Sequence, residues 1–136
     1  MKIFYFVITL LTLFTSCSTD SDETRYFLVL LPVESVVLPS EFVVNKTHAI
    51  PVNYKLPTSC HTFDSFYFDK LEHTRTIAVQ SIKVDKQDCI SSDQTEVQAI
   101  LNFTPTELGP LILKIWKGKN AGGIDIYEEF EATVIE

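Results

Sequence analysis

The feature that most constrains this fold is an alternation of apolar and polar residues, with a period of two, in the second half of the chain. Side chains two residues apart reach the same face of a β-strand, so each alternating run predicts a half-buried strand. The segment 118–123 holds three of the four glycines and predicts a hairpin loop between the last two runs. The apolar faces of the three runs are Val97, Ala99, Leu101 and Phe103, then Leu111, Leu113 and Ile115, then Ile124, Ile126, Phe130, Ala132 and Val134.

The first half of the chain has the same pattern in shorter pieces. The segment 48–56 alternates apolar and polar side chains and predicts another half-buried strand. Two short apolar runs, 26–31 and 33–38, are separated by Pro32. Because proline cannot donate a hydrogen bond to a ladder, these runs predict edge-strand pieces with a kink between them.

An aromatic-rich segment, 61–69, and a β-branched segment, 76–86, predict a hairpin that turns at residues 73–75. In the second of these segments the apolar residues move from odd to even positions near Gln80-Ser81, which predicts a β-bulge at that point. No convincing helical period occurs in the chain.

These patterns together predict an all-β fold for residues 26–136. Short strands separated by turn signals are typical of an antiparallel immunoglobulin-like β-sandwich, here of about seven strands, with a β-barrel as the alternative. The Cys…Trp…Cys spacing of true immunoglobulin domains is absent, because Trp116 follows both cysteines of the domain.

Ahead of this domain, residues 1–16 form an apolar leader with one cation, Lys2. Its apolar block is shorter than the roughly 20 residues that a membrane-spanning helix needs. A charged start, a short apolar core and small residues at the end are typical of a secretory signal peptide.

The sequence Leu13-Phe14-Thr15-Ser16-Cys17 resembles the lipobox of bacterial lipoproteins, and the acidic segment 20–23 behind it resembles the surface-export signal of Bacteroidota lipoproteins. The resemblance implies cleavage before Cys17, multiple acylation of that cysteine, and anchoring to the bacterial outer membrane facing outward, with the periplasmic face as the alternative. Residues 17–25 then form a lipidated, acidic and disordered tether. The competing interpretation is an ordinary secretory signal with a coincidental cysteine.

Lipidation of Cys17 leaves two of the three cysteines, and in an oxidising compartment Cys60 and Cys89 are expected to form a disulfide. Opposed residues of the predicted hairpin have numbers that add up to about 149. Cys60 and Cys89 fit that register and would therefore close the open end of the hairpin as a structural staple.

Charge and motif content exclude several functions. Removing residues 1–16 removes one positive charge and no negative charge, so the formal net charge goes from −7 to −8, which argues against binding nucleic acid. His48, His61 and His73 lack the spacing of metal ligands, and we predict no metal site and no cofactor. No nucleophile elbow or phosphate-binding glycine loop occurs, so we predict that the chain is not an enzyme.

Four aromatic residues are candidates for ligand binding: Trp116, Tyr127, Phe66 and Phe68. Exposed aromatic side chains of this kind are used by sugar-binding sandwiches, although core packing would also account for them. We therefore expect a non-enzymatic structural or protein-interaction module that meets a surface protein or glycan. The alternative is an accessory domain that binds a glycan through these aromatics, or a metal ion.

The segment 33–135 is also similar to small lipoproteins of flavobacteria whose function is not established, and the similarity carries over no catalytic residue. It rests on Leu38-Pro39-x-x-Phe42, Val52-x-Tyr54-x-x-Pro57-x-x-Cys60-His61-x-Phe63, Arg75-Thr76-Ile77-Ala78-Val79 and Ile115-Trp116-x-Gly118.

Overall fold

The computed structural model describes residues 24–92 and 95–136. The predicted leader and the predicted acylation site at Cys17 lie outside the described residues, as does all of the predicted tether except residues 24 and 25. Among the described residues there is no helix, and hence none that could span a membrane. The strands are β1 (Tyr26–Leu31), β2 (Val33–Val36), β3 (Phe42–Val43), β4 (His48–Lys55), β5 (His61–Leu71), β6 (Thr74–Val84), β7 (Glu96–Phe103), β8 (Gly109–Lys119) and β9 (Asp125–Ile135).

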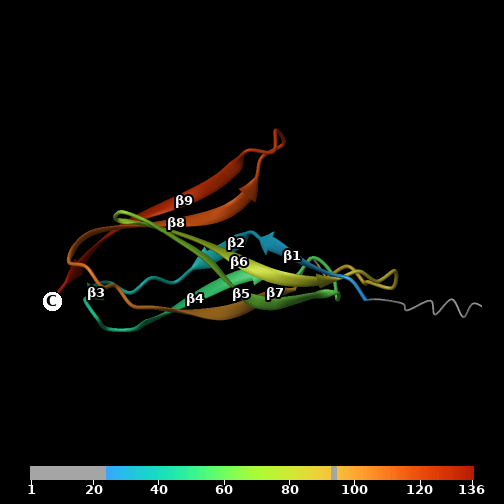
Figure 1. Cartoon of the computed structure of the whole chain (residues 1–136), viewed down its shortest axis with the longest axis horizontal. Coiled ribbons are helices and arrows are strands. Elements are labelled where there is room, and N and C mark those ends of the chain that lie inside the picture. Colours follow the sequence, from blue (N-terminus) through green and yellow to red (C-terminus); the bar gives the residue numbers. More distant parts are fainter. Residues whose placement is uncertain (1–23, 93–94) are drawn as a thin grey trace, which may run out of the picture.

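The fold is all-β, as predicted, and its strands form two sheets (Figure 1). The smaller sheet has the order β2-β4-β7 and is antiparallel. In the larger sheet β6 pairs with β5, β1 and β8, and β8 continues through β9 to β3. Two pairings, β6 with β8 and β3 with β9, are parallel, which differs from the antiparallel arrangement predicted. The nine strands of the described residues also exceed the seven expected.

The hydrophobic core lies between the two sheets and draws on both. Alternation in β4 buries Ile50, Val52 and Tyr54, as the period-two pattern predicted. From the larger sheet the core takes residues such as Val79 and Leu113, both fully buried. Pro32 separates β1, which lies in the larger sheet, from β2, which lies in the smaller one. The predicted kink is therefore the point at which the chain crosses from one sheet to the other.

The hairpin of β5 and β6 is present, but its register differs from the prediction. The turn is at Glu72-His73, where Glu72 has a φ of 50°, and paired residues near it have numbers that add up to 145, as Leu71 and Thr74 do. The bulge lies in β5 at Asp64, opposite Gln80 and Ser81, and not in β6. The alternation within β6 is uninterrupted: Ile77, Val79 and Ser81 are buried on one face, and Ile82 and Val84 lie on the other face, half-buried. The apolar residues therefore change face without any extra residue in β6.

The predicted disulfide between Cys60 and Cys89 is confirmed, but the register argument for it is wrong. Cys60 lies opposite Val84, whose amide donates to the Cys60 carbonyl at 2.9 Å. Cys89 is five residues further on, and the chain after β6 turns back to reach Cys60. Backbone hydrogen bonds from Ser59 to Ile90 and from Ser92 to Pro57 hold this returning segment beside the disulfide.

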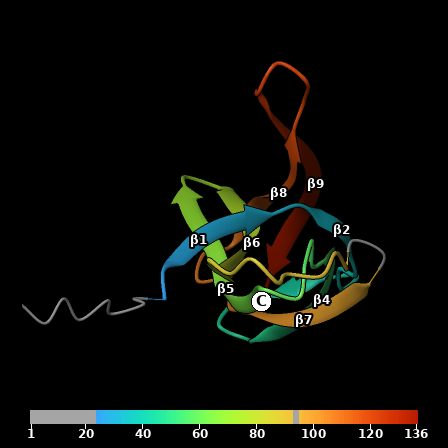
Figure 2. The ribbon, with the colours of Figure 1, turned by 90° about the vertical axis from the view of Figure 1, so that its right-hand side faces the viewer.

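The hairpin of β8 and β9 extends beyond the rest of the fold (Figures 1 and 2). Its inner-facing residues near the body, including Phe130 and Ala132, pack against the core as predicted. Ile124 and Ile126 continue the same alternation but are 68% and 43% exposed. The alternation predicted the face of these residues and not their burial, which requires a second sheet to cover them.

Candidate functional site

The candidate site arises where β6 exchanges one partner strand for another. Along its first residues β6 pairs with β8, and the last pair is Ile77 with Ile115. From Val79 onward the same edge of β6 pairs with β1 instead. The strand β8 then diverges together with β9, which leaves a fork between β1 and the projecting hairpin (Figure 2). Ala78, between the two pairings, lies at the base of this fork.

The fork contains a cavity of about 560 Å³, called here the fork pocket. A volume of this size is within the range of small-molecule sites. Its base includes Thr76 and the small side chain of Ala78. Five strands contribute to its lining, which consists of Val29, Leu30, Tyr67, Thr76, Ala78, Trp116, Lys119, Asp125 and Tyr127.

Trp116 is positioned by hydrogen bonding and by a bulge in β8. The register changes between Trp116, which pairs with Tyr127, and Gly118, which pairs with Ile126, so that Lys117 is the extra residue. The indole Nε1 of Trp116 donates to Asp125 Oδ1 at 2.9 Å. The indole is 9% exposed, so it forms a wall of the pocket with little surface open to solvent.

Asp125 also receives a charged partner at the mouth of the pocket. Lys119 Nζ lies 2.8 Å from the same Asp125 Oδ1 that accepts the indole hydrogen bond. The hydrogen bond from Lys119, followed by that from Trp116, lowers the pKa of Asp125 below its ordinary value, because both stabilise the carboxylate. Asp125 is therefore an ionised acceptor at neutral pH.

The two tyrosines supply the more accessible aromatic surface. Tyr67 of β5 is 43% exposed and Tyr127 of β9 is 37% exposed. Lys114 Nζ lies 4.6 Å from the centroid of the Tyr127 ring and 3.3 Å from Glu129 Oε1. A cation over a ring face is attracted to the π-electrons, so these contacts fix the orientation of Tyr127 beside the pocket.

The structure separates the four aromatic residues that the sequence singled out. Trp116 and Tyr127 line the fork pocket together, as a cross-strand pair of β8 and β9. Phe66 and Phe68 lie instead at a second opening, where Phe66 packs against the core and Phe68 is 44% exposed. The Phe68 ring is 6.1 Å from that of Phe103, across the gap between the two sheets.

The histidines are distributed through the fold. His48 Nε2 accepts a hydrogen bond from the Val43 amide at 3.0 Å, and His61 Nδ1 is 2.9 Å from Thr58 Oγ1. Burial, followed by the nearby charge of Lys83, lowers the pKa of His61. Over residues 24–92 and 95–136, no three side chains of the metal-binding types His, Cys, Asp and Glu gather closely enough to hold an ion.

Sequence reasoning missed Tyr67, Lys119 and Asp125 as members of the site. Lys119 and Asp125 are the last cross-strand pair before the turn of the β8–β9 hairpin. The glycine-rich segment that predicts this hairpin is therefore a signal in the sequence for their pairing. Tyr67 and Ala78 are a cross-strand pair of β5 and β6. Their nearness to Trp116 depends on the exchange of partners along β6, which no local pattern indicates.

Comparison of the chain with family models, curated proteins and solved structures gives no match.

Proposed function

We propose that this chain is a non-enzymatic, membrane-anchored module that binds a carbohydrate ring in the fork pocket. The observation that carries the proposal is the gathering of three aromatic rings, from Tyr67, Trp116 and Tyr127, around one cavity with an ion pair at its mouth. Ligand sites typically combine such apolar walls with a few fixed polar groups. This arrangement favours the ligand-binding alternative over a purely structural or protein-interaction module.

The chemistry of a sugar matches both parts of the pocket. One face of a pyranose ring presents C–H groups, which stack on aromatic rings, and Tyr67 and Tyr127 have accessible surface for that contact. The edge of the sugar presents hydroxyl groups. The Asp125 carboxylate can accept from them and the Lys119 ammonium can donate to them, and hydrogen bonds to charged groups are the stronger kind.

The electrostatics of Asp125 favour binding over hydrolysis. A glycosidase needs one carboxyl group with a raised pKa that can donate a proton to the leaving group. Lys119 and Trp116 shift the pKa of Asp125 in the opposite direction. The carboxylate of the fork pocket is therefore suited to accept hydrogen bonds and is a poor general acid.

The proposal includes the anchor and the finer fold class. We assign the two sheets to the immunoglobulin-like β-sandwich class, which is supported by the core that lies between them. Anchoring to the outer membrane, facing outward, rests on the lipobox resemblance at Cys17. A tether that ends just before β1 would then display the domain away from the lipid surface.

The test uses Trp116 as a reporter, because it is the only tryptophan in the chain and lines the pocket. The full chain, purified in non-ionic detergent, is titrated with cellobiose, maltose and lactose while Trp116 emission is recorded. We expect a saturable change with at least one sugar. Tyr67→Ala and Tyr127→Ala should each weaken that binding about tenfold, the equivalent of about 1.4 kcal/mol.

The matched control is Tyr26→Ala, which removes a 66% exposed tyrosine of β1 that is not part of the pocket lining. Its affinity for the sugar should equal that of the unmodified chain. If no sugar gives a saturable change, or if Tyr26→Ala weakens binding as much as Tyr67→Ala does, the carbohydrate proposal is wrong.

The anchor is tested separately by labelling bacterial cells with an alkyne analogue of palmitate. We expect Cys17→Ala to abolish labelling and to remove the protein from the membrane fraction, whereas Cys60→Ala should retain the label. Continued incorporation of the fatty acid into the Cys17→Ala chain would contradict acylation at this residue.

A further inference from the structure

A second cavity, of about 370 Å³, is lined by residues of the edge strands β5 and β7 and of the segment 104–106 that follows β7. Its apolar wall includes Phe66 and Phe68 from β5 and Phe103 from β7. We call it the edge pocket. It shares no lining residue with the fork pocket.

The charge of the edge pocket is opposite to that of the chain. The two charged residues in its lining are both cations, Lys70 and Arg75, although the chain as a whole has a formal net charge of −7. Phe68 precedes Lys70 on the same strand and its side chain is 44% exposed, so an accessible apolar surface adjoins the positive charges. A pocket with this composition is complementary to an anion that carries an apolar group.

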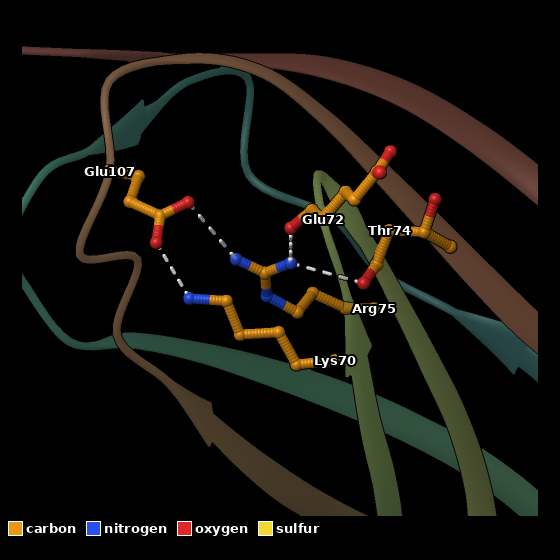
Figure 3. Close-up of polar contacts among 5 residues, drawn as sticks. All are labelled: Lys70, Glu72, Thr74, Arg75 and Glu107. Carbon is orange, nitrogen blue, oxygen red and sulfur yellow. Dashed lines mark hydrogen bonds and ion pairs between the residues drawn. The ribbon is translucent and has the colours of Figure 1, made fainter.

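Arg75 is held in place by the turn of the β5–β6 hairpin (Figure 3). Its side chain is 7% exposed, and its Nη1 donates to the carbonyl oxygens of Glu72 at 2.7 Å and of Thr74 at 3.0 Å. Both contacts use the same nitrogen, and the other terminal nitrogen, Nη2, is directed toward Glu107. The guanidinium is therefore fixed before any ligand arrives, and its Nη2 faces the position of a carboxylate, which Glu107 occupies.

Glu107 already places a carboxylate against both cations. Lys70 Nζ lies 2.7 Å from Glu107 Oε1, and Arg75 Nη2 lies 4.0 Å from Glu107 Oε2. Glu107 belongs to the connection between β7 and β8, and its side chain is 51% exposed. Lys70, through its hydrogen bond and its charge, and Arg75, through its charge, lower the pKa of Glu107, so the field here stabilises a carboxylate.

We infer that the edge pocket is a second ligand site, specific for a small carboxylate with an apolar body, and that Glu107 occupies the cation pair until the ligand displaces it. The ligand's carboxylate takes the position of the Glu107 carboxylate between Lys70 Nζ and Arg75 Nη2. Its apolar body lies against Phe68 and Phe66. The exchange costs little in total, because the ligand's carboxylate takes over the contacts with Lys70 and Arg75 that Glu107 gives up, and the Glu107 side chain, already 51% exposed, becomes solvated.

The test compares three carboxylates with their neutral amides. The full chain in non-ionic detergent is titrated with benzoate, phenylacetate and 3-phenylpropionate, and with the corresponding amides, by saturation-transfer NMR against micelles alone. We expect at least one carboxylate to bind and its amide to bind at least tenfold more weakly, because a hydrogen bond to a charged group is the stronger kind.

Two variants of the same ion pair separate a gated site from a structural contact. Lys70→Gln should weaken the bound carboxylate about tenfold, and Glu107→Gln should tighten it at least threefold, because Glu107→Gln removes the internal competitor. If Lys70 and Glu107 formed only a structural ion pair, both substitutions would change the affinity for the carboxylate in the same direction and by a similar factor. The controls Lys55→Gln and Glu34→Gln break a surface pair at 3.8 Å elsewhere and should leave the affinity unchanged.

Circular dichroism of each variant verifies that the fold is retained. Failure of all three carboxylates to bind overturns the proposal, as does equal binding of acids and amides. Unchanged or weaker carboxylate binding by Glu107→Gln overturns the displacement of Glu107. These outcomes are independent of the sugar titration, because Trp116 reports on the other pocket.

Discussion

The disulfide between Cys60 and Cys89 should supply a large part of the stability of this domain. The perturbation is the double substitution Cys60→Ala and Cys89→Ala, which leaves no free thiol in the domain. The two cysteines are 29 residues apart in sequence. In the chain-entropy model, opening a loop of that length lowers the free energy of unfolding by about 3.6 kcal/mol at 25 °C.

Contacts beside the disulfide do not replace it. The returning segment keeps backbone hydrogen bonds such as those between Ser59 and Ile90, but these form only in the folded state and so restrict nothing in the unfolded chain. The stabilisation in this model comes from the smaller entropy of the cross-linked unfolded ensemble. The double variant is therefore expected to fold with the same sheets and to unfold more easily.

The assay is equilibrium unfolding in urea, followed by Trp116 fluorescence. For a domain of this size, with a urea m-value of about 1.5 kcal/mol/M, the midpoint should fall by about 2.4 M. The unmodified chain with its disulfide reduced should unfold at the same midpoint as the double variant. A fall of less than about 0.5 M, which is about 0.8 kcal/mol at this m-value, would refute loop closure as the source of the stability.

The glycine of the β8 bulge and the carboxylate of the fork pocket give two more predictions. Gly118→Ala should lower the free energy of unfolding by about 1–3 kcal/mol in the same urea assay, because φ is 104° and the new Cβ would lie 3.2 Å from Pro32 Cγ. An unchanged free energy would contradict this strain. Because Lys119 and Trp116 lower the folded-state pKa of Asp125 below its ordinary 3.8, its stabilisation is present above pH 3.8 and is lost as the pH falls through the lower folded pKa. When Trp116 fluorescence is followed in an acid titration, the midpoint should lie below pH 3.8, and it should be higher in Lys119→Gln than in the unmodified chain. A midpoint above pH 3.8 in the unmodified chain would be inconsistent with the pairing of Asp125 with Lys119 and Trp116.

The sequence predicted the strands well because the choice of face along a strand is a local property. Ile50, Val52 and Tyr54 alternate with polar or half-buried neighbours, and β4 buries all three. The same rule applied to Ile126 gave the correct strand and the wrong burial, because Ile126 is in β9 but 43% exposed. Whether a face is covered depends on a strand of another sheet, and that strand can lie anywhere in the chain.

The alternation of apolar residues did not predict strand registers and strand pairings, because these also depend on segments that are distant in the sequence. The cysteines were paired correctly by counting, yet Cys60 faces Val84 and the chain returns to bring Cys89 beside it. Of the four aromatic residues that the sequence indicates as candidates for ligand binding, Trp116 and Tyr127 share a pocket. Tyr67 lines that pocket only because the strand that pairs with β6 changes from β8 to β1. This change depends on segments that are far apart in the sequence.

The geometry of the fork also explains why a proline, Pro32, and a glycine, Gly118, lie next to each other in the structure. Pro32 ends β1 and sends the chain to the smaller sheet, and the Gly118 backbone of β8 passes against the Pro32 ring, where a Cβ would be crowded. Next to it, Lys117 Nζ donates to the Glu34 carbonyl of β2 at 2.7 Å and lies 3.4 Å from Glu128 of β9. These contacts attach the diverging hairpin to the strand that follows the crossing. Neither Pro32 nor Lys117 lines the fork pocket. If the carbohydrate proposal is correct, we expect Pro32→Ala and Lys117→Gln to change the affinity measured in the sugar titration, because both residues hold the hairpin that carries Trp116 and Tyr127.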